Sequence, residues 1–304
     1  MKIYIACLKN LVTGGIELLH QLCHELNTYA DIDAYIWFED EKDAIIPKPY
    51  MKYGNIVAIN SRPSKDTVLI FPEVWASKTN SEKYKDHQKV IYWESVDYYI
   101  QWIPKSQYLK FPDGVIHIAQ SYYAYEWLKR ETNIDAIMVT DYLNDEFMNA
   151  DLGKPRKRQI LYNPKKGLDI TTRLITQMPN EKFIPIMDMT VSQVKTLMEE
   201  SMLYIDFGNH PGKDRIPREA AMCGCCVITN RKGSADNLID VPIPSEYKFH
   251  ECFMNLAISQ MKFVLDNYNG CKYDFDDYRE VIKNEKGWFK KGVEKLVSKL
   301  GVIE

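Results

Sequence analysis

Short apolar segments alternate with helical patterns along the chain, and this alternation is the feature that most limits the fold. In the first half, runs rich in β-branched and aromatic residues predict strands at residues 3–7, 34–38, 55–59, 68–71, 90–93, 115–119 and 136–139. After Gly14 and Gly15, apolar residues recur on one helical face, as in a helix that packs on a sheet. The pattern predicts strand, glycine turn and helix, and then a parallel sheet.

A second series of the same kind follows a polar stretch at 149–159 that contains Gly153 and Pro155. It predicts strands at 159–162, 183–186, 202–207 and 226–229, with helices at 168–177, at 191–200 and after 214. We therefore expect an α/β protein of two Rossmann-like domains, residues 1–150 and 155–285, that face each other across a cleft. Residues 286–304 are expected to form a terminal helix that packs back on the first domain.

Composition excludes several classes of protein. The 304 residues carry a formal net charge of -3, which argues against a nucleic-acid-binding surface. No apolar run approaches the roughly 20 residues of a membrane span, and "MKIYIACL" lacks the pattern of a signal peptide. The 7 cysteines are an odd number and crowd at "CGCC", which suits a reducing compartment better than a disulfide framework. The expected location is the cytoplasm.

The stretch "HPGKDRIPREAAMCGCCVIT", residues 210–229, points to an anion site. Asp214 is a suitable N-cap for a helix that follows, and a helix amino end favours an anion such as phosphate. Lys213, Arg215 and Arg218 add positive charge there. Glu219 has an acceptor-only carboxylate that suits ribose hydroxyls. The alternative from the residues alone is a helix start with surface ion pairs of i,i+4 spacing.

This stretch resembles the donor-binding motif of the GT-B glycosyltransferases, above all the retaining family 4. The matching positions are Glu219, Ala220, Met222, Cys223, Gly224 and Val227. Further segments resemble the family's landmarks in the same order: "TGGIELL" its first glycine loop, "TDYLNDEF" its domain-closing motif, "YNPKKG" its Gly-Arg turn, and "LMEESMLYIDF" the helix and strand before the donor motif. The likeness spans most of the chain, as several weak motifs.

The chain also departs from that family. Pro211 stands where the first glutamate of the donor motif is expected, and the arginine of the Gly-Arg turn is missing, with Asn163 nearby. The C-terminal domain is shorter than the family norm by about one strand and helix. We expect His210 to take over the donor-facing position and Lys166, which matches the family, to bind the diphosphate.

The resemblance implies transfer of a sugar from a nucleotide sugar to a glycan acceptor, free or lipid-linked, in bacterial surface polysaccharide synthesis. The expected catalytic residues are Lys166, Lys213, Arg215 and His210, because cations stabilise the leaving diphosphate. The donor contacts are Gly14, Gly15, Arg218 and Glu219. No cofactor and no obligatory metal are expected, since the nucleotide sugar is a substrate and the cations are side chains.

A retaining enzyme needs no protein base, whereas an inverting one would use a carboxylate or His near the end of an N-terminal strand. The acids in suitable loops are Glu17, Glu73, Glu94 and Asp97. Two alternatives remain open: a non-catalytic GT-B module that binds nucleotide sugar or glycan, and a nucleotide-sugar epimerase. Lysines of 154–158 and of the terminal helix are compatible with peripheral contact at the inner membrane.

Overall fold

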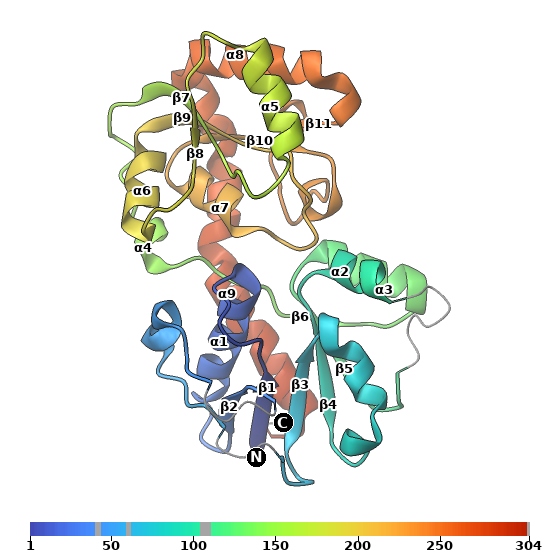
Figure 1. The fold of residues 1–304 in the computed structure, drawn as a ribbon. Coiled ribbons are helices and arrows are strands. Elements are labelled where there is room, and N and C mark those ends of the chain that lie inside the picture. Colours follow the sequence, from blue (N-terminus) through green and yellow to red (C-terminus); the bar gives the residue numbers. More distant parts are fainter. Residues whose placement is uncertain (40–43, 59–61, 104–110, 303–304) are drawn as a thin grey trace. The chain divides into compact units, whose positions relative to one another are not determined.

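The computed structural model describes residues 1–39, 44–58, 62–103 and 111–302 (Figure 1). They form two compact units, each with its own sheet. One unit comprises Met1–Asp141 and Lys286–Glu304, and the other comprises Tyr142–Glu285. The terminal segment thus belongs to the first unit.

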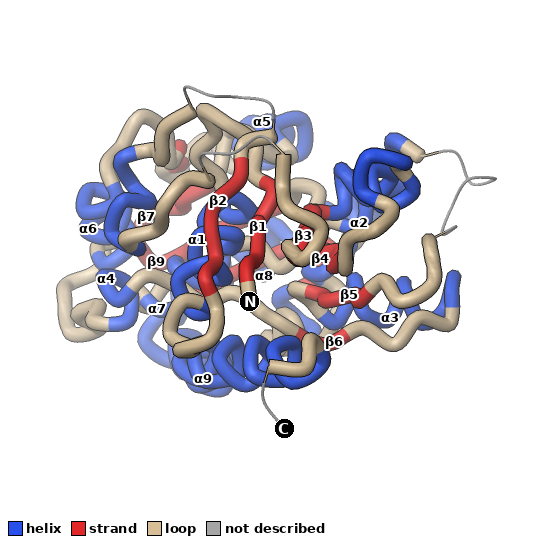
Figure 2. Tube along the Cα trace, turned by 90° about the horizontal axis from the view of Figure 1, so that it is seen from below, coloured by secondary structure: helices blue, strands red, loops and turns tan. Residues whose placement is uncertain are grey.

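The first unit is built on a six-stranded sheet in the order β2-β1-β3-β4-β5-β6, with every pair of strands parallel (Figure 2). Its strands are β1 (Lys2–Ala6), β2 (Asp33–Trp37), β3 (Val68–Pro72), β4 (Lys89–Trp93), β5 (Ile116–Ala119) and β6 (Ile137–Met138). Its helices include α1 (Gly14–Leu26), α2 (Val96–Trp102) and α3 (Tyr122–Thr132), with 3-10 turns η1 (Lys48–Tyr53), η2 (Glu73–Asn80) and η3 (Glu82–Tyr84). The apolar face predicted for α1 is buried.

The strand predicted at 55–59 is wrong for the residues described. Only Val57 forms an isolated bridge, to Ile36 of β2, and residue 59 lies outside the described residues. The Asn55 side chain instead donates to the backbone oxygen of His20 at 2.9 Å. This contact ties the segment to α1, so it adds no further strand.

The second unit is built on a five-stranded parallel sheet in the order β11-β10-β9-β7-β8. Its strands are β7 (Lys157–Tyr162), β8 (Phe183–Pro185), β9 (Ser201–Asp206), β10 (Cys226–Asn230) and β11 (Lys248–Phe249). Its helices are α4 (Asp145–Met148), α5 (Leu168–Gln177), α6 (Val191–Glu199), α7 (Arg215–Met222), α8 (Met254–Cys271) and α9 (Asp276–Lys299), which continues into the first unit. The two-residue β11 was not predicted, because it is too short to show an apolar pattern.

Two features of the second core bear on the sequence analysis. Leu143 and Phe147 are buried in it, so the chain enters this unit before the polar stretch at 149–159. The three cysteines of "CGCC" are buried thiols. Burial raises the pKa of Cys225 to about 12, and its Sγ donates to the backbone oxygen of Met198 at 3.2 Å. The three cysteines pack as small apolar side chains.

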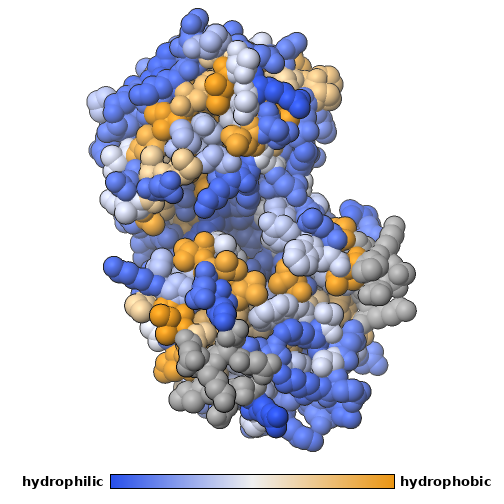
Figure 3. Space-filling view, in the orientation of Figure 1, coloured by the Kyte–Doolittle hydropathy of each residue, from blue (hydrophilic) through white to orange (hydrophobic). Residues whose placement is uncertain are grey.

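The surface of both units is largely hydrophilic in the view of Figure 3. On the face in view, hydrophilic residues cover much of each unit, with apolar residues between them (Figure 3). Within the described ranges, no helix combines the length and the apolar character that a bilayer span requires.

Helix α9 packs its second half closely on the first sheet. A Cβ at Gly292 would lie 2.3 Å from the backbone oxygen of Met138 in β6, so only glycine allows this approach. Phe289 and Val293 beside it are fully buried. Gly287, on the same helix, has open space where a Cβ would be.

We expect Gly292→Ala to destabilise the protein by about 1–3 kcal/mol, because the methyl group would overpack against β6. Gly287→Ala is the matched control and should stabilise it by up to about 1 kcal/mol through helix propensity. Urea unfolding of the two variants measures both effects. Equal effects of the two substitutions would contradict the close packing of α9.

Candidate functional site

The candidate site lies in the second unit, where β9 ends and α7 begins. Here Gly167 and Gly208 allow two turns to touch. A Cβ at Gly167 would lie 2.5 Å from the carbonyl carbon of Phe207, and one at Gly208 would lie 2.4 Å from the Cβ of Lys166. Gly167 also has a φ of 58°. The two glycines therefore bring the turn of Lys166 against the loop before α7.

Lys166 forms an ion pair with Asp214 in this place. Its Nζ donates to Oδ1 and Oδ2 of Asp214 at 2.6 and 2.7 Å. Asp214 is the N-cap residue of α7, as the sequence predicted, but its side chain makes no capping hydrogen bond. The carboxylate is instead directed to cationic side chains.

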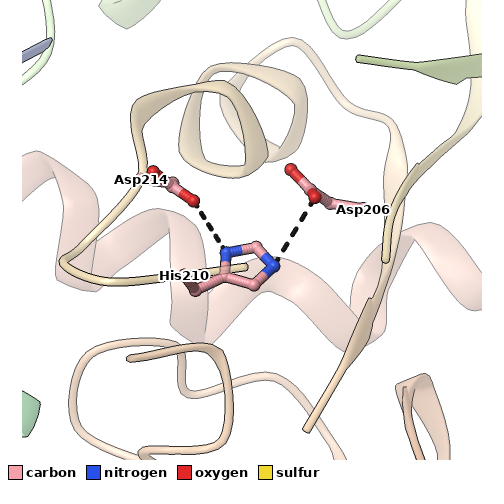
Figure 4. Close-up of side chains that lie close together, drawn as sticks. All are labelled: Asp206, His210 and Asp214. Atoms are coloured by element: carbon pink, nitrogen blue, oxygen red, sulfur yellow. Dashed lines mark ion pairs between the residues drawn. The ribbon is translucent and has the colours of Figure 1, made fainter. Parts of the chain in front are cut away.

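His210 is the second cationic partner of Asp214, and it lies between two carboxylates (Figure 4). Its Nδ1 lies 2.8 Å from Oδ2 of Asp214, and its Nε2 lies 3.5 Å from Oδ1 of Asp206. Asp206 also accepts from the hydroxyl of Tyr204 at 2.8 Å and from the backbone N–H of Gly208 at 3.0 Å. The side-chain contacts thus form a continuous series from Tyr204 through Asp206, His210 and Asp214 to Lys166.

The pKa values of His210 and Asp214 both shift in the direction that favours the charged form. Burial by itself would lower the pKa of His210, but the negative charge of Asp206 and the hydrogen bond to Asp214 outweigh it and raise that pKa. Burial would likewise raise the pKa of Asp214, but the hydrogen bond from His210 and the charge of Lys166 lower it. The arrangement favours an imidazolium held by two carboxylates.

The donor atoms of Asp206, His210 and Asp214 lie close enough together to consider a metal ion. The two ring nitrogens of His210, however, face different carboxylates, and a metal would use only one of them. The ammonium of Lys166 also lies on Asp214. The geometry is therefore that of a salt-bridge chain.

We expect the stabilising contribution of His210 to be present below the ordinary histidine pKa of about 6.5 and to be lost as pH rises through the raised folded-state value. His210→Gln should remove this slope, so parent and variant should converge in unfolding free energy toward high pH. Urea unfolding between about pH 6 and 9 measures it. Asp206→Asn should weaken the slope, and a slope unchanged in His210→Gln would contradict the assignment.

Glu285 of α9 is a second centre of buried charge, and the sequence analysis missed it. Its Oε1 lies 2.7 Å from Nζ of Lys213, and its Oε2 accepts from Nη1 of Arg218 at 2.7 Å. Arg218 and Glu285 have no exposed surface. No local motif could have indicated this pairing, because Glu285 is 67 residues from Arg218 in sequence.

The arginines of the turn, which the sequence analysis expected to act together, lie in different surroundings. Arg218, expected to contact donor phosphate, is fully buried, and its Nε and Nη2 donate to the backbone oxygens of Asp214 and Lys213. Arg218 thus supports the loop from inside, and its contact with donor phosphate stays a prediction. Arg215 donates from Nη2 to the backbone oxygen of Tyr142 at 2.7 Å. Glu219 is half-buried on α7.

Glu285→Ala should destabilise the protein by about 3–5 kcal/mol, because it leaves the charges of Arg218 and Lys213 buried without their carboxylate. Glu280→Ala is the control on the same helix, where the exposed carboxylate pairs with Lys283, and should change stability by less than about 1 kcal/mol. Thermal and urea unfolding compare them. A small effect at Glu285 would show that the buried charges do not depend on it.

In the first unit, Gly15 lies against a carboxylate. A Cβ at Gly15 would lie 2.3 Å from Oε2 of Glu94, so glycine makes room for that side chain at the start of α1. The backbone N–H of Glu94 donates to Oε2 of Glu73 at 2.9 Å. Burial raises the pKa of Glu73 to about 7, and burial together with the charges of Glu73 and Asp141 raises the pKa of Glu94.

The structure thus separates the four acids that the sequence offered as bases. Glu73 and Glu94 come together after β3 and β4. Glu17 accepts from Lys52 at 2.7 Å and from the Tyr53 hydroxyl at 2.8 Å. Asp97 accepts from the Tyr123 hydroxyl at 2.6 Å. Burial raises the pKa of Glu73, Glu94 and Asp97, the direction that suits proton transfer, and only Glu73 and Glu94 of these acids lie together.

No protein-family model and no curated protein sequence matches this chain. Solved structures share its fold. Sucrose-phosphate synthase of Thermosynechococcus elongatus is 12% identical, with a TM-score of 0.68 over 99% of both chains. Anabaena HepE, crystallised with UDP-glucose, is 10% identical, with a TM-score of 0.69 over 98% of this chain and 100% of that one. The lipopolysaccharide outer core galactosyltransferase WaaB is 12% identical, with a TM-score of 0.66 over 97% and 99%.

These likenesses and the two parallel sheets confirm the expected fold, an α/β protein of two Rossmann-like units of the GT-B type. At this level of identity they show the fold alone.

Proposed function

We propose that this chain is a glycosyltransferase that moves a sugar from a nucleotide sugar to a glycan acceptor in bacterial surface polysaccharide synthesis. The observation that carries the proposal is the placement of Lys166, by Gly167 and Gly208, beside the loop that leads into the amino end of α7. A cation next to the amino end of a helix suits a diphosphate. The complex of HepE with UDP-glucose and the activity in the name of WaaB support the choice of substrates.

In this proposal the protein acts mainly through charge. As the bond between the sugar C1 and the diphosphate oxygen breaks, Lys166 and the amino end of α7 stabilise the charge on the leaving group. Arg215 adds to the positive potential, and Glu219 binds the ribose hydroxyls. Lys213, which is paired with Glu285, supports the loop from inside. No metal ion or other cofactor is required. His210 is held between carboxylates and acts by orienting Asp214.

We further propose a retaining outcome, in which the acceptor oxygen bonds to C1 and its proton passes to the leaving phosphate. The acceptor is a glycan, free or lipid-linked. Lys290, Lys291, Lys295 and Lys299 of α9 would allow peripheral contact with an anionic membrane. Gly14 and Gly15 would line the approach to phosphate or sugar at the start of α1.

A non-catalytic GT-B module is the second candidate, and one observation favours it. Pro211 stands where the donor motif has its first glutamate, so no carboxylate at that position can contact the donor sugar. Such a module would bind nucleotide sugar yet neither transfer nor hydrolyse it. An epimerase would form product from the nucleotide sugar without acceptor.

We expect Glu219→Ala to weaken binding of the matching nucleoside diphosphate about tenfold, because it removes hydrogen bonds to the ribose. Lys166→Ala should reduce turnover more than nucleoside affinity, because the leaving charge loses its cation. Lys165→Ala, exposed in the same turn, is the control. Thermal shifts with UDP, GDP, CMP, ADP and dTDP, followed by donor hydrolysis assays, measure these effects. Binding that is unaffected by either variant would place the site elsewhere.

A further inference from the structure

The carboxylate of Asp214 forms an ion pair with Lys166, the cation that the proposed function assigns to the diphosphate. We infer that Asp214 is an internal anion that competes with ligand phosphate for Lys166, so that a nucleoside diphosphate binds by displacing it. This inference rests on the proposed function, because it concerns the same site. It makes Asp214 a residue that determines which ligands the site accepts.

The contacts of Asp214 are those that a bound phosphate would make. Its two oxygens accept from Nζ of Lys166 at 2.6 and 2.7 Å, and Oδ2 lies 2.8 Å from Nδ1 of His210 (Figure 4). The residue also stands directly before α7, where the helix dipole favours negative charge. The carboxylate of Asp214 thus pairs with two cationic side chains at the start of the helix.

Helix capping does not explain where the Asp214 side chain lies. An N-cap aspartate ordinarily accepts from a backbone N–H of the first turn, but the Asp214 side chain makes no such bond. The ion pair is also within reach of solvent, because the side chains of Lys166 and Asp214 are 29% and 22% exposed. By contrast, the neighbouring pair of Arg218 and Glu285 is fully buried. Of these two pairs, a ligand can reach only the first.

Competition by a carboxylate selects for charge on the ligand. A ligand must compensate for the lost ion pair and for the negative charge of Asp214, which remains beside His210. Asp206 on the far side of His210 adds negative charge as well. A diphosphate meets this requirement better than a monophosphate, and an uncharged nucleoside cannot displace the carboxylate. The inferred ligands are nucleoside diphosphates and their sugars.

Calorimetric titration of the whole chain with inorganic pyrophosphate, UDP, GDP, ADP and uridine tests the inference. Asp214→Asn should tighten pyrophosphate and the matching nucleoside diphosphate about five- to tenfold, with little change for uridine. In the Lys166→Ala background the same substitution should give no such gain, since the contested cation is absent. Asp236→Asn, which removes an exposed carboxylate paired with Arg231, is the control. It should change neither the affinity for pyrophosphate nor that for the nucleoside diphosphate.

The outcomes separate the inference from the proposed function. A nucleoside diphosphate that binds the parent but binds Asp214→Asn equally or more weakly overturns the inference and leaves the function standing. Tighter pyrophosphate without binding of any nucleotide supports the internal anion and counts against the nucleotide site. Absence of binding to every variant overturns both. Asp214→Ser, which keeps a residue suited to an N-cap, repeats the test should the asparagine variant fail to fold.

Discussion

The second unit depends on the pairing of charges that its fold removes from water. A buried arginine or carboxylate without a partner costs several kcal/mol, so each such group in the loop before α7 must have an opposite charge beside it. Glu285 supplies that charge for Lys213 and Arg218, and Asp206 and Asp214 supply it for His210. These contacts hold the loop against α9 on one side and β9 on the other. Lys166 owes its position to the same network through Asp214.

Glycine makes this network geometrically attainable. Backbone contacts at Gly167 and Gly208 are closer than any side chain would allow, and they place the turn after β7 beside the loop after β9. In a parallel sheet, neighbouring strands end at the same edge, so residues that follow β7 and β9 naturally meet. The sheet brings the two loops together, glycine sets their separation, and charge determines which side chains touch.

The network also changes how the basic residues of α7 are understood. In the sequence they form one group that suits phosphate. In the structure Arg218 faces Glu285 inside the protein, while Lys166, from a different loop, lies at the start of the helix with Asp214. A count of basic residues in a motif therefore overstates the charge available to a ligand. The available charge depends on which cations already have an internal anion.

Local pattern alone determined most of the secondary structure. The helix predicted at 168–177 has those bounds, and the apolar faces of α1 and α9 are buried, because periodicity reports directly which side of an element meets the core. The same patterns indicated two parallel α/β units and Asp214 as the N-cap of α7, while the GT-B fold was implied by the resemblance of the motifs to that family. The pattern wrongly predicted a strand at 55–59, where Val57 forms only an isolated bridge. It missed β11, because two residues are too few to show a periodicity.

The tertiary structure decided the partners of the charged residues. Glu285 and Arg218, or Lys166 and Asp214, are far apart in sequence, and each could equally have faced solvent on its own element. Electrostatic pairing depends on distances of a few ångströms and on the exclusion of water, and both arise only when sheets, loops and helix have packed. A sequence specifies which groups carry charge; the packed fold determines which of them neutralise one another and which remain within reach of a ligand.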